Sequence, residues 1–197
     1  MRILRNHALL VALLIMFPAN AFSQDVPPAQ DEPPAQNAPP AVRGKSVIIT
    51  WTENRSQRQA GEARFRDIVD PLSQTIYFST GGRPFLRFAS TLRGRAASSQ
   101  GEGMSGKSFS GGSRQIEFMG QSFTLISTSK GGVARRITVG FNDTFSTCTA
   151  QVVFAKEAGA NVVMGKSLYT GKPLEIRSGT VSGVSCKVRD GNVSAGP

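Results

Sequence analysis

Apolar and polar residues alternate along much of the chain after residue 42, and this period of two is the strongest constraint on the fold. Successive side chains of a β-strand point to opposite faces, so the pattern predicts strands with one buried face. The apolar phases include Val47, Ile49 and Trp51, and later Ile137, Val139 and Phe141. Helical spacing is scarce, and its best candidate, 57–66, covers only a turn or two.

Glycine turns separate the predicted strands. Gly81-Gly82 stands between the segments 76–78 and 86–88, and a second hairpin is predicted around Gly120, because glycine adopts the positive φ of a tight turn. The Gly- and Ser-rich segment 93–113 is instead predicted to be a long loop. About eight or nine short strands at this spacing predict an all-β fold, a single small antiparallel β-sandwich or closed barrel.

The two cysteines of the chain, Cys148 and Cys186, fall in the apolar phase of two predicted strands. Two inward-facing thiols can bridge two strands within one core, so we expect a structural disulfide. It would close a loop of about 39 residues and stabilise the fold by about 4 kcal/mol in the chain-entropy model.

Residues 1–23 have the three parts of a secretory signal peptide: a basic start, an apolar run at 8–17 and small residues before the cleavage site. Cleavage after Ala21 and after Ser23 both fit. The apolar run is about half the length of a membrane-spanning helix, so the chain is not expected to span the membrane. We expect an exported protein, either periplasmic or secreted.

A Pro-, Ala- and Gln-rich linker follows at 24–42, with repeated Pro-Pro-Ala-Gln, a composition that favours extended polyproline II structure and cannot bury a core. The remaining residues, 43–197, are enough for one folded β domain.

The formal net charge of the chain is +10, and arginines crowd the first half of the predicted domain. The planar guanidinium binds carboxylate and phosphate groups bidentately, so an outward basic surface would bind an anionic glycan or a lipid head group. The predicted ligand-binding residues are Arg64, Arg66, Arg87, Arg93 and Arg95. The alternative is a solvated face with local ion pairs to nearby acidic residues.

Two short motifs are interpreted as accidental. Residues 101–108 match the phosphate-binding pattern GxxxxGKS, but no buried strand leads in and no helix follows, so no nucleotide site is predicted. Residues 127–130 match SxxK, but the companion motifs of serine acyl-transfer enzymes are missing.

The only histidine, His7, lies in the signal peptide, which excludes histidine-dependent catalysis and histidine-ligated metal from the mature chain. No cofactor or metal is expected. The leading expectation is a non-enzymatic module that binds an anionic envelope component. The first alternative is a protein-interaction module that uses a strand edge or the Gly-rich loop to bind a protein partner. The second is a hydrolase using carboxylates such as Glu117 and Asp143.

Overall fold

The computed structural model describes residues 38–92, 95–102, 114–129 and 132–193, and these residues form a nearly all-β fold. One 3-10 turn, η1 (Pro40–Val42), precedes the strands. The ten strands of the described residues are β1 (Lys45–Gln59), β2 (Arg66–Phe78), β3 (Pro84–Leu92), β4 (Arg95–Glu102), β5 (Arg114–Met119), β6 (Ser122–Ser129), β7 (Gly132–Phe141), β8 (Cys148–Val153), β9 (Val163–Lys166) and β10 (Pro173–Asp190).

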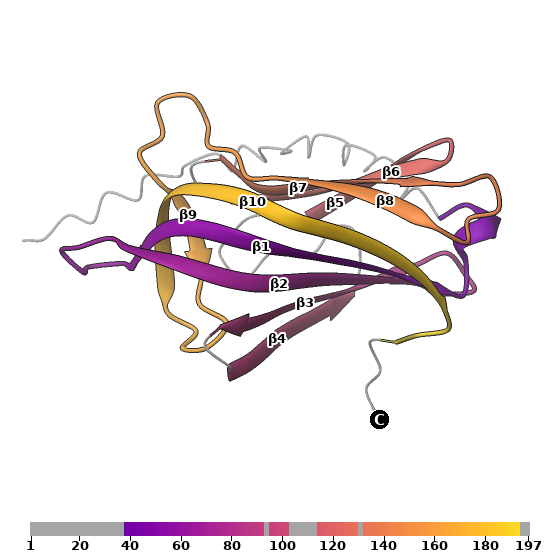
Figure 1. Ribbon diagram of the computed structural model, residues 1–197, viewed down its shortest axis with the longest axis horizontal. Coiled ribbons are helices and arrows are strands. Elements are labelled where there is room, and N and C mark those ends of the chain that lie inside the picture. Colours follow the sequence, from indigo (N-terminus) through magenta and orange to yellow (C-terminus); the bar gives the residue numbers. More distant parts are fainter. Residues whose placement is uncertain (1–37, 93–94, 103–113, 130–131, 194–197) are drawn as a thin grey trace, which may run out of the picture. The chain divides into compact units, whose positions relative to one another are not determined.

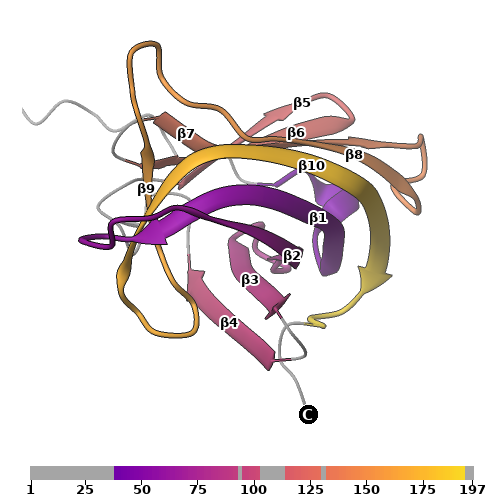
Figure 2. The same cartoon turned by 60° about the vertical axis from the view of Figure 1, so that its left-hand side comes forward.

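The strands form two antiparallel sheets (Figure 1). The first has six strands in the order β4-β3-β2-β1-β10-β9, and the second has four in the order β5-β6-β7-β8. The six-stranded sheet is strongly curled (Figure 2), and β8 lies beside β10 in both views. The predicted all-β class is confirmed, as are the hairpins around Gly81-Gly82 and Gly120.

One apolar core lies between the two sheets, and the alternating phases of the sequence build it. Val47 and Ile49 on β1 are fully buried, and they belong to the same cluster as Phe123 on β6 and Val139 on β7. Aromatic rings pack at the centre of the cluster, where Phe78 and Phe123 meet edge to face with centroids 5.6 Å apart. Burial of one face therefore favours a single pairing register for the strands that contribute to this core.

A glycine bulge bends β10. Thr50 pairs with Ser185 and Thr52 with Ser182, so β10 has one more residue than β1 between these two pairs. Gly183, inside this interval, has a φ of +63°. An extra residue in one strand increases the local twist, and its left-handed conformation suits glycine. The bulge thus contributes to the curl of the sheet.

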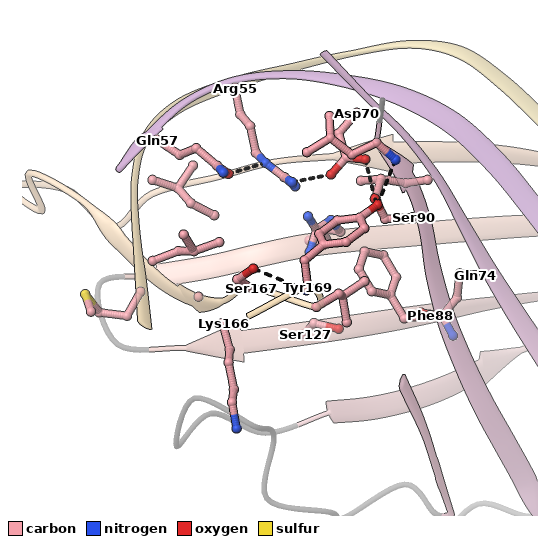
Figure 3. Close-up of a pocket in the computed structure, with 18 of the residues that line it drawn as sticks. Arg55, Gln57, Asp70, Gln74, Phe88, Ser90, Ser127, Lys166, Ser167 and Tyr169 are labelled. Atoms are coloured by element: carbon pink, nitrogen blue, oxygen red, sulfur yellow. Dashed lines mark hydrogen bonds and ion pairs between the residues drawn. The ribbon is translucent and has the colours of Figure 1, made fainter. Parts of the chain in front are cut away.

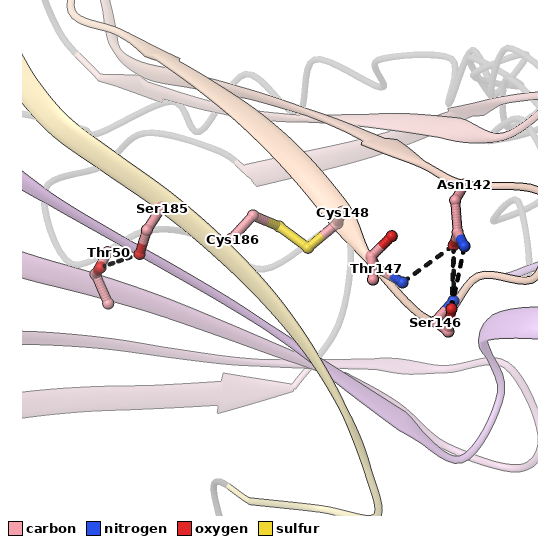
Figure 4. Close-up of a disulfide and its surroundings, with 7 residues drawn as sticks. All are labelled: Thr50, Asn142, Ser146, Thr147, Cys148, Ser185 and Cys186. Atoms are coloured by element: carbon pink, nitrogen blue, oxygen red, sulfur yellow. Dashed lines mark hydrogen bonds between the residues drawn. A yellow bond between two sulfur atoms is a disulfide. The ribbon is translucent and has the colours of Figure 1, made fainter.

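The predicted disulfide is present and joins the two sheets (Figure 4). Cys148 begins β8 and Cys186 lies on β10, with the Cα atoms 5.5 Å apart. The β7–β8 turn positions Cys148, because the Asn142 side-chain oxygen accepts hydrogen bonds from the backbone N–H groups of Ser146 and Thr147 at 2.9 and 3.0 Å. The disulfide is therefore a covalent tie between two layers that share one core.

Residues 38–42, which belong to the segment 24–42 predicted as a linker, are part of the described fold. Ala38 and Val42 are fully buried against the core, and η1 positions Val42. The strand β4 likewise lies inside the segment 93–113, which the sequence predicts as a loop. Its Ser, Ala and Gly residues pair with β3 through the backbone, and they lack the apolar alternation that indicates a strand in a sequence. No helix in the described ranges is long and apolar enough to cross a membrane.

Candidate functional site

A cavity of about 170 Å³ lies between the two sheets, near the segment that connects β9 to β10. Its wall draws on β1, β2, β3, β9 and β10 of the six-stranded sheet and on β5, β6 and β7 of the four-stranded sheet (Figure 3). Four cationic side chains line it: Arg55, Arg114, Arg135 and Lys166. Asp70 is the only acidic residue among the described lining residues, so the wall is cationic.

A buried ion network stands behind this wall. Arg55 on β1 donates to Glu53 at 2.8 Å, to Asp70 on β2 and to Gln57 at 2.6 Å. The side chains of Glu53 and Asp70 are each only 1% exposed. Arg135 on β7 donates to the Glu53 carboxylate at 2.6 Å, so this carboxylate binds one arginine from each sheet. The network therefore holds the two sheets together at the cavity.

Glu53 remains ionised in this environment. Burial alone would raise the pKa of Glu53, but the charges of Arg135 and Arg55 and the hydrogen bonds they donate outweigh it, and the pKa lies below its ordinary value. A glycosidase-type general acid needs a raised pKa so that it holds a proton to give. The charge of Glu53 therefore suits it to orient Arg55 and Arg135, and not to donate a proton.

A chain of hydrogen bonds extends the network to the segment after β9. The Ser90 hydroxyl on β3 donates to Asp70, and the Tyr169 hydroxyl lies 2.7 Å from the Ser90 oxygen. The backbone N–H of Leu92 donates to the Tyr169 oxygen at 2.7 Å. The Ser90 proton is used on Asp70, so Tyr169 is the donor to Ser90. These bonds, of which those joining Asp70, Ser90 and Tyr169 are visible in Figure 3, fix the Tyr169 segment against β3 beside the cavity.

A cross-strand row of Arg, Ser and Arg forms the opposite part of the wall. Arg114 on β5 pairs with Ser127 on β6, and Ser127 pairs with Arg135 on β7. Residues directly opposite on neighbouring strands share a face, and all three line the cavity. Two strand spacings put the two arginine backbones about 10 Å apart, with Ser127 between them. The row therefore brings two arginines, and the serine between them in the sheet, to one cavity.

Arg114 is the under-neutralised member of this row. Burial lowers the pKa of Arg114, and the charge of the neighbouring Arg135 lowers it further. Within the described ranges no carboxylate lies at salt-bridge distance from Arg114, whereas Arg135 is paired with Glu53. An anion bound over Ser127 would relieve the repulsion between the two guanidinium groups.

Of the predicted arginines, the three with described side chains, Arg64, Arg66 and Arg87, do not line this cavity. Arg64 and Arg66 are exposed at the β1–β2 hairpin, on either side of Phe65. Arg66 pairs with Gln57, whereas Arg87 on β3 pairs with Thr75. Arg66 and Thr75, the partner of Arg87, lie about 30 Å apart along β2 at the usual rise per residue.

The other two predicted arginines are less fully placed. Arg95 begins β4, but its side chain lies outside the described part of the chain, and so does Arg93 altogether. Arg87 is half-buried, and its Nε atom has no hydrogen-bond partner among the described residues.

A smaller basic cluster surrounds Phe65 at the hairpin. The guanidinium carbons of Arg58 and Arg177 lie 4.6 and 4.8 Å from the centroid of the Phe65 ring. Arg58 also forms an ion pair of 2.6 Å with Glu175. Arg58 is thus already paired, in contrast to Arg114 in the cavity.

The remaining motifs do not converge on the cavity. Glu117 and Asp143 are exposed and accept hydrogen bonds from the side chains of Gln115 and Gln121. In the SxxK segment Ser127 lies in a strand, not one helical turn before a lysine, and Lys130 is outside the described residues. Of the GxxxxGKS segment 101–108, only its first two residues, at the end of β4, are described. Groups of three or more potential metal ligands are not found in the described ranges.

The acidic members of the site were missed by the sequence analysis, although a signal for them exists. Glu53 and Arg55 continue the inward phase of Trp51 along β1, and Asp70 continues that of Leu72 along β2. Charged residues in a buried phase need partners, so their position predicts a buried network. The comparisons add no known protein to this description: no family model, no curated protein and no solved structure matches the chain.

Proposed function

We propose that this chain is an exported, non-enzymatic binding protein for an acidic component of the cell envelope. Its ligand presents a carboxylate or phosphate group, as an acidic polysaccharide or a lipid head group does. The acidic group is bound in the cavity between the sheets, over Ser127 and between Arg114 and Arg135.

The observation that carries this proposal is the Arg114–Ser127–Arg135 row. Its two guanidinium groups face one cavity, and Arg114 has no acidic partner in the described part of the chain. Guanidinium groups bind carboxylate and phosphate oxygens through paired N–H donors, and the Ser127 hydroxyl adds another donor. Partial burial strengthens each of these bonds relative to the same bond in water.

Export is supported by the disulfide and by the amino-terminal sequence. Disulfides persist in oxidising compartments such as the periplasm and the extracellular space. The Cys148–Cys186 bond joins two sheets and leaves no free cysteine among the described residues. The signal-like residues 1–23 provide the route to such a compartment.

An NMR titration of the mature, disulfide-bonded protein tests the site. Inorganic phosphate and glucuronate are the probes, and the readout is the shift of backbone amide signals. We expect the shifts to centre on Ser127 and its neighbours on β5 and β7. Arg114→Gln should weaken binding about tenfold or more, because a hydrogen bond to a charged group contributes about 1.5–3 kcal/mol. Binding should also weaken as the salt concentration rises.

Arg64→Gln is the matched control, because it removes the same charge from an exposed position outside the cavity. Its effect on affinity should be less than twofold. Equal losses in Arg64→Gln and Arg114→Gln would contradict a site in the cavity. An interaction with envelope material that persists at high salt would instead favour the protein-interaction alternative.

A further inference from the structure

Apolar side chains form a second part of the cavity wall, beside the Arg114–Ser127–Arg135 row. Side chains from both sheets and from the segment after β9 form it, namely Phe88, Ile137, Leu168, Leu174 and Ile176. The cationic row thus shares the cavity with a set of apolar side chains and with the polar groups around Asp70. A simple inorganic anion would leave these apolar walls in contact with water.

Several other polar groups of the wall are engaged with one another. Arg55 binds Asp70, Ser90 donates to Asp70, and Tyr169 lies in hydrogen-bond distance of Ser90. These bonds occupy polar groups that could otherwise have recognised the hydroxyls of a sugar ring. The arrangement favours an apolar body over a hydroxylated one on this side of the cavity.

The size of the cavity sets the size of that body. An engineered apolar cavity of about 150 Å³ binds benzene, so a cavity of about 170 Å³ holds a group of ring size or a short alkyl chain. Arg135 connects the two halves of the site, because its guanidinium carbon lies 4.8 Å from the centroid of the Phe88 ring. A ligand bound to Arg135 therefore meets the apolar wall directly.

From this geometry we infer that the ligand is a small amphiphilic anion, with an acidic group at Arg114 and Arg135 and a ring-sized or short alkyl group against the apolar wall. This inference rests on the proposed function, because it concerns the same site. The ligand is then a lipid-like or aromatic acid and not an acidic polysaccharide.

The test is a titration of the mature, disulfide-bonded protein with the straight-chain carboxylates acetate, butyrate, hexanoate and octanoate. Inorganic phosphate and phenyl phosphate form a second matched pair. Burial of each methylene should increase affinity about fourfold, until the cavity is full and the increase stops. Phenyl phosphate should bind at least tenfold more tightly than inorganic phosphate. Hexanol, which has the chain without the charge, should bind much more weakly than hexanoate.

Leu168→Gln tests the apolar wall separately from the cations. It should flatten the dependence on chain length and leave the affinity for inorganic phosphate within twofold of the wild-type value. Met119→Gln is the control, since Met119 is 80% exposed at the end of β5 remote from Arg114. The chain-length dependence of Met119→Gln should match that of the wild type.

Different results would contradict the amphiphilic ligand and the proposed anion-binding function. Equal affinity for acetate and octanoate, with binding of both lost in Arg114→Gln, would overturn the amphiphilic ligand and keep the anion site. Absence of binding by every anion, phosphate included, would overturn the proposed function itself. A chain-length increase that is unchanged in Leu168→Gln would also overturn the inference, because the hydrocarbon would then lie elsewhere.

Discussion

At the residue scale, Glu53 is the central member of the buried network. It bonds Arg55 within its own strand and Arg135 on the opposite sheet, with its side chain 1% exposed. A buried ion pair offers little net stability over an apolar replacement, but the removal of one partner leaves an uncompensated buried charge. Glu53 therefore fixes the position of Arg135 in the cavity at the cost of making the fold dependent on one carboxylate.

We predict that Glu53→Gln lowers the free energy of unfolding at pH 7 by about 3–5 kcal/mol, because Arg135 loses its acidic partner and Arg55 keeps only Asp70. The folded pKa of Glu53 is depressed, so its contribution is complete above the ordinary value of 4.5 and is lost as the pH falls through the folded pKa. Urea denaturation of the wild type and the variant at a series of pH values from 7 down to 3 measures the difference in their free energies of unfolding. The difference between wild type and variant should shrink in acid.

Glu117→Gln provides the control, since it makes the same substitution at an exposed position on β5. Its free energy of unfolding should stay within about 0.5 kcal/mol of the wild type at pH 7. A Glu53→Gln variant that is equally stable would contradict the role assigned to the network.

At the element scale, β10 has to pair with β1 over most of its length and also to bend, and it does so through bulges at two register shifts. One contains Gly183 and the other contains Arg177, the residue that covers the Phe65 ring. The bulge at Gly183 lies three residues before Cys186, which forms the disulfide with Cys148. A regular strand without a bulge would bend and twist less at this point.

We predict that Gly183→Ala destabilises the protein by roughly 1–2 kcal/mol, because a Cβ atom is disfavoured at the φ of +63°. Gly140→Ala on β7 is the matched control. Gly140 has no positive φ, and a Cβ atom there would lie 3.5 Å from the Thr149 hydroxyl, an ordinary contact. Thermal unfolding of both variants measures the difference, and equal losses would contradict a bulge-specific requirement.

At the scale of the whole molecule, two ties hold the sheets together in addition to the apolar core. The disulfide joins β8 to β10, and the ion pair of Glu53 with Arg135 joins β1 to β7 beside the cavity. The cavity depends on the spacing of the sheets, since its cations come from both. The disulfide and the Glu53 carboxylate therefore maintain the sheet spacing on which the proposed anion site depends, although neither is proposed to touch the ligand.

We predict that the double variant Cys148→Ala, Cys186→Ala loses about 4 kcal/mol of unfolding free energy, the chain-entropy value for a loop of about 39 residues. Urea denaturation of this variant and of the reduced wild type should give the same midpoint. A loss below about 1 kcal/mol would show that the bond adds little constraint to the unfolded chain.

Local sequence patterns were sufficient to predict the fold class and the disulfide. The inward phase of Val47, Ile49 and Trp51 is visible in the sequence because a strand has a fixed period of two. The same reasoning put Cys148 and Cys186 in buried phases, where a bond between them is expected. The strand β4 was missed, because its small residues show no apolar alternation.

The sequence by itself determined which residues face inward, since side-chain period depends only on the backbone geometry of each strand. Only the tertiary structure decided which inward residues meet. Arg114 and Arg135 are adjacent because β6 lies between β5 and β7, and Glu53 reaches Arg135 because the second sheet covers the first. Strand order and sheet packing are long-range properties, and no local pattern specifies them.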